Sequence, residues 1–444
     1  MGLRRPFLWV LCYLYVDIVA PQKFIPILAG APLSFVTFML AGVAWALVDR
    51  GAGTRFTPRQ GLILLLLVWC ALTTHFAQFP AAAATKWAWV WKALVFAIFL
   101  PLTLRTRLRI EAAALVMVLS AAAIVVSGAL KTLTSGGGYG LLHFFVNDNT
   151  GLYEGSTLSM AAIAIIPLIL WLAKFGTILP PSKPLRLAAW GLVACCLLIP
   201  VGTVARTGLI CAGLLAVVML RSVRRRALYL VGLAGAVLLA LPLLPASYTE
   251  RMGTIGHHEA DESASTRVAV WKWTLGYVAE HPLGGGFQAY LGNHLKIETR
   301  GVDSSGAGSV EAVNVQNTTD NARAFHSAYF EMLGEQGWPG LALWLTLQIS
   351  GLVQLESVQR RLRRAPLAID RRDGALALAL QQGHIVYLFG ALFVGIAYQP
   401  FIFMLIGIQV ALVENVRRRL MPGKPRDEKR AMPLPAGAAP LRAP

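Results

Sequence analysis

Two arginines stand out because they lie outside the clusters of basic residues that separate the apolar segments. Arg206 lies at the end of an apolar segment, and Arg267 comes just before residues 268–275, which have the pattern of an amphipathic helix. A guanidinium presents a rigid fork of donors that fits phosphate oxygens, and the start of a helix adds free N–H groups. Two such arginines on one face of a membrane would suit a diphosphate. The alternatives are an arginine that reaches lipid headgroups, for Arg206, and a solvated side chain, for Arg267.

One histidine has neighbours that suggest proton transfer. His326 is followed by Ser327. After nine further residues come Gly337 and then Gly340, where another apolar segment begins. The pKa of histidine lies near neutrality, and adjacent cations would keep the ring neutral and able to accept a proton. We therefore interpret His326 as a candidate general base. On its chemistry alone, an ordinary loop histidine is the better interpretation, so the case depends on the pattern around it.

Several other groups compete as a base or as metal ligands. Asp17 lies near the end of the first apolar segment and Asp148 in a polar segment, but neither belongs to a recognisable motif. His257, His258 and Glu259 hint at a metal site, although their spacing is not helical. We predict no metal and no cofactor. The chain has no GxxxxGK[ST] motif for ATP, so any substrate must arrive already activated.

The composition excludes most soluble classes of protein. Of the 444 residues, 56% are hydrophobic and only 14% are charged, against about 45–50% and about 25% in soluble domains. The net charge is +18, from 40 basic and 22 acidic residues. A nucleic-acid-binding domain can carry such a net charge, but not with so few charges in total. The composition therefore favours a polytopic membrane protein. The five cysteines lie in apolar segments and are expected to be buried apolar side chains.

The elements that must position these residues are apolar segments separated by clusters of arginine and proline. Each approaches the length of about 20 residues that crosses a bilayer as a helix. The twelve segments are 7–20, 25–48, 61–75, 87–104, 111–130, 157–173, 187–201, 206–220, 227–245, 338–357, 374–396 and 401–416. We therefore predict an all-α polytopic membrane protein with about twelve transmembrane helices.

The basic residues predict the orientation of these helices. With the N-terminus in the cytoplasm, 29 of the 40 basic residues fall on the segments that face inward, as the positive-inside rule requires. Both termini are then cytoplasmic, and we expect the inner membrane of a bacterium. The predicted division is into 1–245 with nine helices, 246–337 as a long periplasmic loop, 338–416 with three helices, and 417–444 as a basic, proline-rich, disordered tail.

The long loop and its borders resemble a known family. His326-Ser327-x9-Gly337-x2-Gly340 is similar to the His-[Asn/Ser/Gln]-x9-Gly-x-x-Gly signature of the bacterial O-antigen ligase family. The stretch from His281 to Phe287 resembles a His-Pro-Leu-x-Gly-x-Gly segment of the same superfamily of ligases and polymerases. Residues 205–208 resemble its Ser-Arg-Thr-Gly segment, with Ala205 where serine is usual.

The resemblance implies a fold and an activity. It implies a GT-C-like glycosyltransferase whose long periplasmic loop holds short amphipathic helices. Such ligases transfer O-antigen from undecaprenyl diphosphate to a sugar hydroxyl of lipid A–core, without metal or ATP. By position, Arg206 and Arg267 would bind the donor diphosphate and His326 would act as base on the acceptor hydroxyl, with Ser327, Gly337 and Gly340 completing the motif. The reaction would invert the anomeric centre.

Other functions stay open. An O-antigen or exopolysaccharide polymerase would use the same donor with another lipid-linked glycan as acceptor. An oligosaccharyltransferase that glycosylates proteins usually carries additional soluble sequence. A transporter or lipid flippase would have charged residues deep in its helices and two repeated halves, and neither is evident here.

Overall fold

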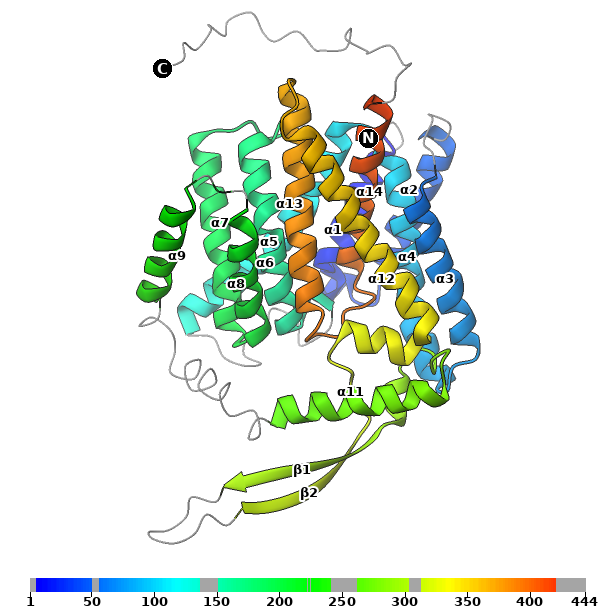
Figure 1. Ribbon diagram of the computed structural model, residues 1–444. Helices are drawn as coiled ribbons and strands as arrows, with labels where there is room; N and C mark the ends of the chain where they lie inside the picture. The colour runs from blue at the N-terminus through cyan, green and yellow to red at the C-terminus, as the bar shows by residue number, and fades with distance from the viewer. Residues whose placement is uncertain are drawn as a thin grey trace, which may run out of the picture.

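Long helices side by side form the body of the protein (Figure 1). The computed structural model describes residues 5–49, 56–135, 151–221, 223, 225–240, 262–302 and 313–420. Within these ranges the α-helices are α1 (Phe7–Val19), α2 (Leu33–Ala44), α3 (Pro58–His75), α4 (Pro80–Thr103), α5 (Arg107–Ser135), α6 (Gly155–Phe175), α7 (Lys183–Gly202), α8 (Arg206–Met219), α9 (Arg226–Ala240), α11 (Glu262–Glu280), α12 (Ala328–Leu362), α13 (Ala368–Gly390) and α14 (Pro400–Leu420).

Each of the twelve predicted apolar segments contains a helix. Six of the described helices are long and apolar enough to cross a membrane by length and composition, namely α4, α5, α6, α7, α12 and α14. The chain is therefore a largely helical protein with several candidate membrane spans, while the number twelve and the GT-C-like architecture stay predictions. The helix α13 is less apolar because its buried side chains include Gln381, Gln382 and His384.

Local sequence signals explain several helix starts. Thr57 and Gln60 form a capping box at the start of α3, in which each side chain bonds the backbone N–H of the other residue. Glu154 caps α6 by accepting from the N–H groups of Ser156 and Thr157, at 3.1 and 2.6 Å. Because the first N–H groups of a helix lack partners within it, these caps define where the helices begin.

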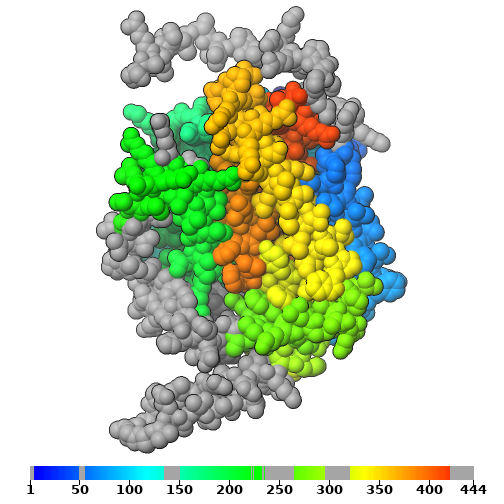
Figure 2. Space-filling view, in the orientation of Figure 1, coloured from blue at the N-terminus to red at the C-terminus, as the bar shows by residue number. Residues whose placement is uncertain are grey.

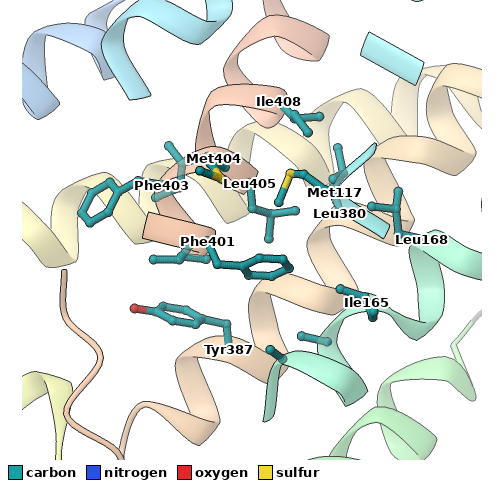
Figure 3. Packing of buried hydrophobic residues seen from close by; sticks show 14 of the residues in the cluster. Met117, Ile165, Leu168, Leu380, Tyr387, Phe401, Phe403, Met404, Leu405 and Ile408 are labelled. Atoms are coloured by element: carbon teal, nitrogen blue, oxygen red, sulfur yellow. The ribbon is translucent and has the colours of Figure 1, made fainter. Parts of the chain in front are cut away.

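The hydrophobic core extends through the bundle, and Figure 3 shows the part of it between α5, α6, α13 and α14. Met117 from α5, Leu168 from α6, Leu380 from α13 and Leu405 from α14 meet there and are almost fully buried. Burial of each such side chain is worth about 1.5–3 kcal/mol in water, but in lipid the gain comes from close packing. The core therefore holds the bundle as one unit from which the functional end projects.

Ion pairs tie together the segments that were predicted to face the cytoplasm. Asp49 pairs with Arg105 and Arg109. Asp370 and Asp373 each pair with both Arg107 and Arg419, and Glu111 pairs with Arg372. These residues belong to segments far apart in the sequence, so the contacts bring several predicted inward-facing segments to one end of the bundle. The side of the membrane that this end faces stays a prediction.

The opposite end carries residues 262–302 and 313–336, which precede the part of α12 that runs into the bundle. The helix α11 lies across this end, and an antiparallel hairpin of β1 (His294–Val302) and β2 (Val313–Asn321) extends beyond it (Figure 1). The hairpin differs from the all-α expectation for this loop. Its strands pair from His294 opposite Asn321 to Val302 opposite Val313. The signal in the sequence is the mixture of valine, isoleucine and threonine on both sides of a glycine- and serine-rich turn region.

Candidate functional site

His326 lies in the short connection between β2 and α12. Its side chain is exposed, and its backbone has φ +47°, in the left-handed region that non-glycine residues rarely adopt. The next residue, Ser327, is buried and is the N-cap of α12. Non-glycine residues persist in this region only where the surroundings hold them, and such positions cluster at functional sites. The connection therefore presents His326 at the start of a helix.

Two side chains hold the connection that carries His326. The buried Asn293 donates its amide to the carbonyl of Arg323 at 2.7 Å and accepts from the N–H of Arg323 at 3.0 Å. The indole of Trp271 donates to the carbonyl of Phe325 at 3.0 Å, and its ring stacks on Phe330 at 4.9 Å. The backbone is thus held at Arg323 and at Phe325, the residue that precedes the histidine.

Gly337 divides α12 into two parts. At φ +64° and ψ −168° it is not helical, so residues 328–336 lie across the end of the bundle and the later residues run into it (Figure 1). A Cβ at Gly337 would lie 2.3 Å from the carbonyl oxygen of Pro282, and one at Gly340 would lie 2.2 Å from the Cβ of Gln336. Both glycines of the motif are therefore required by close approaches of the chain.

The segment 282–286 bonds to this break in α12. The N–H of Trp338 donates to the carbonyl of Pro282 at 3.0 Å, and those of Gly285 and Gly286 donate to the carbonyls of Gly334 and Glu335 at 3.0 and 2.9 Å. The two stretches that resemble family motifs thus lie against each other, although about 50 residues separate them in the sequence. Together they set the direction of residues 328–336.

The structure brings Arg267 close to His326. Arg267 lies one helical turn before Trp271 on α11, and Trp271 contacts the backbone beside the histidine. Figure 2 shows the atoms of α11 packed against those of α12. Although His326 reaches solvent, the protein around its ring lowers the pKa below the ordinary 6.5, and the cation Arg267 lowers the pKa further. Glu154 opposes this shift by raising the pKa, and Arg323 adds to it.

Glu154 and Arg323 were not singled out from the sequence. Both act on His326 from a short distance, Glu154 from the start of α6 and Arg323 from the same connection as the histidine. Nothing in the local sequence distinguishes Glu154 from any other helix cap. Arg323 could have been noticed, since it is a cation three residues before His326.

Arg206 is the first residue of α8, as predicted for an anion site at a helix start. The start of α8 lies against the start of α6, since a Cβ at Gly208 would meet the side chain of Ser159 at 2.6 Å. Farther along α8, Cys211 lies beside Gly390 of α13. The next residue of the chain, Ala391, accepts a hydrogen bond from the N–H of Ala328 at the start of α12. The helix α8 therefore packs against α6 and α13, but Arg206 is not among the charged groups that act on His326.

A buried ionic cluster lies behind residues 328–336. The ammonium of Lys86, from α4, donates to Glu331 at 2.6 Å and to both oxygens of Glu335 at 2.8 and 2.9 Å. All three side chains are buried, and the ammonium also lies over the rings of Phe287 and Tyr398. The cluster could not be predicted from local sequence patterns, because Lys86 is 245 residues from Glu331. The available signal was a lysine within an apolar stretch and two glutamates one helical turn apart.

The remaining candidates have other surroundings. Asp17 accepts a hydrogen bond from Ser34 at 2.9 Å, between α1 and α2, and is not among the charged groups that act on His326. Asp148 and the group at 257–259 lie outside the described residues. Among the described residues, no three histidine, cysteine or acidic side chains are placed to hold a metal ion.

Two parts of the chain match known protein families. Residues 191–345 match the protein family described as O-antigen ligase, and this range includes Arg206, Arg267, His326 and both motif glycines. Residues 1–177 match a family of unknown function, DUF5935. No curated protein matches the chain.

Proposed function

Because residues 191–345 of this chain belong to the O-antigen ligase family, we propose that the protein is a ligase that attaches a lipid-linked polysaccharide to a membrane acceptor. The donor would be O-antigen on undecaprenyl diphosphate, and the acceptor a sugar hydroxyl of lipid A–core. The reaction would take place at the periplasmic face of the inner membrane. The observation that carries the proposal is an exposed histidine at a helix start, with Arg267 and Arg323 acting on its ring.

His326 is proposed to act as the general base. In the proposed step the acceptor oxygen forms a bond to C1 of the donor sugar, while the bond from C1 to the diphosphate oxygen breaks. The proton of the acceptor hydroxyl passes to His326, and the electron pair of the broken bond leaves with undecaprenyl diphosphate. Attack opposite the leaving group inverts the anomeric centre. A lowered pKa suits this role because it keeps the ring neutral near pH 7.

Arg206 and Arg267 are proposed to bind the donor diphosphate. Arg206 starts a helix, where free N–H groups and the helix dipole favour an anion. Arg267 lies on α11, across the end of the bundle, close to the histidine. Negative charge grows on the diphosphate as the bond to the sugar breaks, so fixed guanidinium groups stabilise the transition state more than the ground state. No divalent cation is required in this scheme.

The proposal is tested in a strain that lacks this gene but makes the donor. We expect the wild-type gene to restore polysaccharide-bearing lipopolysaccharide, and His326→Ala, Arg206→Ala and Arg267→Ala each to leave the polysaccharide on undecaprenyl diphosphate with normal protein levels. The matched control is His75→Ala, which removes another exposed histidine at the end of α3 and should retain full activity. Full transfer by His326→Ala would overturn the role of the base.

The same strain distinguishes a ligase from a polymerase. Loss of a ligase leaves long chains on the lipid carrier, whereas loss of a polymerase leaves core bearing a single repeat unit. The second pattern would replace the ligase proposal with a polymerase that uses the same donor. Accumulation of the donor on the cytoplasmic side instead would point to a flippase.

A further inference from the structure

The ionic cluster behind the site joins four parts of the chain at one point. Lys86 belongs to α4, and Glu331 and Glu335 belong to the part of α12 before Gly337. Glu335 also accepts from the N–H of Gln288 at 2.8 Å, in the segment that follows 282–286. Glu331 also accepts from the N–H of Ala397 at 2.9 Å, between α13 and α14. One ammonium therefore holds four stretches of backbone through two carboxylates.

The cluster is too specific to be explained by packing alone. Two carboxylates face a single ammonium, and all three groups are buried, which is costly unless their hydrogen bonds are satisfied. Each carboxylate accepts a further hydrogen bond, Glu335 from the N–H of Gln288 and Glu331 from the N–H of Ala397. The ammonium lies 5.6 and 4.8 Å from the ring centroids of Phe287 and Tyr398. Apolar side chains of similar volume would fill the space but would not define a single position for residues 328–336.

The location of the cluster links it to the histidine. Glu331 is five residues after His326, and the N–H of Glu331 donates to the carbonyl of Ser327 at 2.8 Å within the first turn of α12. Any shift of residues 328–336 along or about their axis therefore moves His326 relative to Arg267, which is carried by a different helix. The cluster is the ionic contact that fixes this short helix against α4.

We propose that Lys86, through Glu331 and Glu335, is a positioning residue that sets His326 in register with Arg267. This inference rests on the proposed function, because it takes His326 as the base. Lys86 itself would touch neither substrate, since Phe287, Tyr398 and the two glutamates surround its ammonium.

The test compares purified variants in lipid nanodiscs with a lipid-diphosphate-linked oligosaccharide and lipid A–core. We expect Lys86→Met to lower kcat per folded molecule by about 100-fold, the loss typical of a misplacement of about 1 Å, with the donor KM changed far less. Lys86→Arg keeps the charge and should recover part of kcat. The triple variant with Lys86→Met, Glu331→Gln and Glu335→Gln removes the unpaired charges, while each glutamine oxygen can still accept its backbone N–H. It should fold but stay low in kcat.

A pH profile separates positioning from general stability. In Lys86→Met the histidine should move away from Arg267, so the pKa seen on the acid side of kcat/KM should rise towards the ordinary value of histidine. A purely structural loss lowers the amount of folded protein without moving this pKa. If Lys86→Met fails to fold, Lys86→Arg and the triple variant provide the same two readouts.

The matched control is Arg59→Met, which removes another buried cation. Arg59 lies at the start of α3, at the opposite end of the bundle. Its buried guanidinium donates to Gln409 of α14 at 3.1 Å. It should lower the melting temperature but leave kcat per folded molecule and the pH profile unchanged. Unchanged kcat and pH profile in the Lys86 variants, or equal losses in Arg59→Met, would overturn the positioning role. Full activity of His326→Ala would instead overturn the proposed function and leave the Lys86 result to describe structure only.

Discussion

Gly284 and Gly337 approach each other so closely that neither position has room for a side chain. A Cβ on Gly284 would lie 2.4 Å from the backbone nitrogen of Gly337, and a Cβ on Gly337 would lie 2.6 Å from that of Gly284. Both residues also have positive φ, at +82° and +64°. This contact joins the segment after α11 to the break in α12, and it sets the direction of the short helix that begins next to His326.

The contact predicts a strong effect of Gly337→Ala. The left-handed conformation alone costs about 1–3 kcal/mol for a residue with a Cβ, and overlap with the backbone of residues 282–284 adds to it. We expect a lower melting temperature in detergent and loss of polysaccharide transfer in the deletion strain.

The matched control for that substitution is Gly276→Ala on α11. A Cβ at Gly276 would meet nothing within 4 Å, so the change should be neutral or stabilising by about 0.5–1 kcal/mol, as expected for alanine in a helix interior. Wild-type stability and transfer in Gly337→Ala would show that the two segments are not held by this contact.

The charges around His326 predict opposite shifts in the pH profile. The neutral ring is the active form, so kcat/KM should fall as pH decreases through the pKa of His326, which lies below 6.5. Arg323→Gln removes a cation that lowers this pKa, so the fall should move to higher pH. Glu154→Gln removes an anion that raises the pKa, so the fall should move to lower pH, while the glutamine oxygen can still cap α6.

The measurement is kcat/KM between pH 5 and pH 8 for both variants at one ionic strength, because salt screens these interactions. Lys272→Gln, on the exposed face of α11, is the charge control and should leave the profile in place. Shifts of the same sign in Arg323→Gln and Glu154→Gln would contradict the assignment of the acid limb to His326.

Trp271→Phe should separate a hydrogen bond from ring packing. A phenylalanine ring can still stack on Phe330, but it cannot donate to the carbonyl of Phe325, the residue before the histidine. We expect about 1 kcal/mol lower stability and about a tenfold lower kcat, because the connection that carries His326 loses one of its supports. Steady-state kinetics and thermal unfolding on the same preparation measure both.

The control for this change is Trp190→Phe, at an exposed position of α7 that should tolerate it. Equal kcat in Trp271→Phe and wild type would mean that the indole bond does not position the histidine.

Much of the candidate site could be predicted because its signals are local. The spacing from His326 to Gly337 and Gly340 is a property of one stretch of chain, and Arg206 and Arg267 stood out as cations outside the clusters of basic residues predicted to face the cytoplasm. The hairpin was missed because its strands are largely polar and lie within a loop in which only amphipathic helices were expected. The cluster of Lys86 with Glu331 and Glu335 was missed because its members come from opposite ends of the chain.

By itself, the sequence determined the helical character of this protein and the segments in which the helices lie. In a membrane, a backbone without water must satisfy its own hydrogen bonds, so apolar composition and length are enough to require helices. The tertiary structure alone decided that Gly284 meets Gly337, that Glu154 acts on His326, and that Lys86 lies behind the short helix. These contacts depend on how helices pack, and packing joins residues without regard to their separation in the chain.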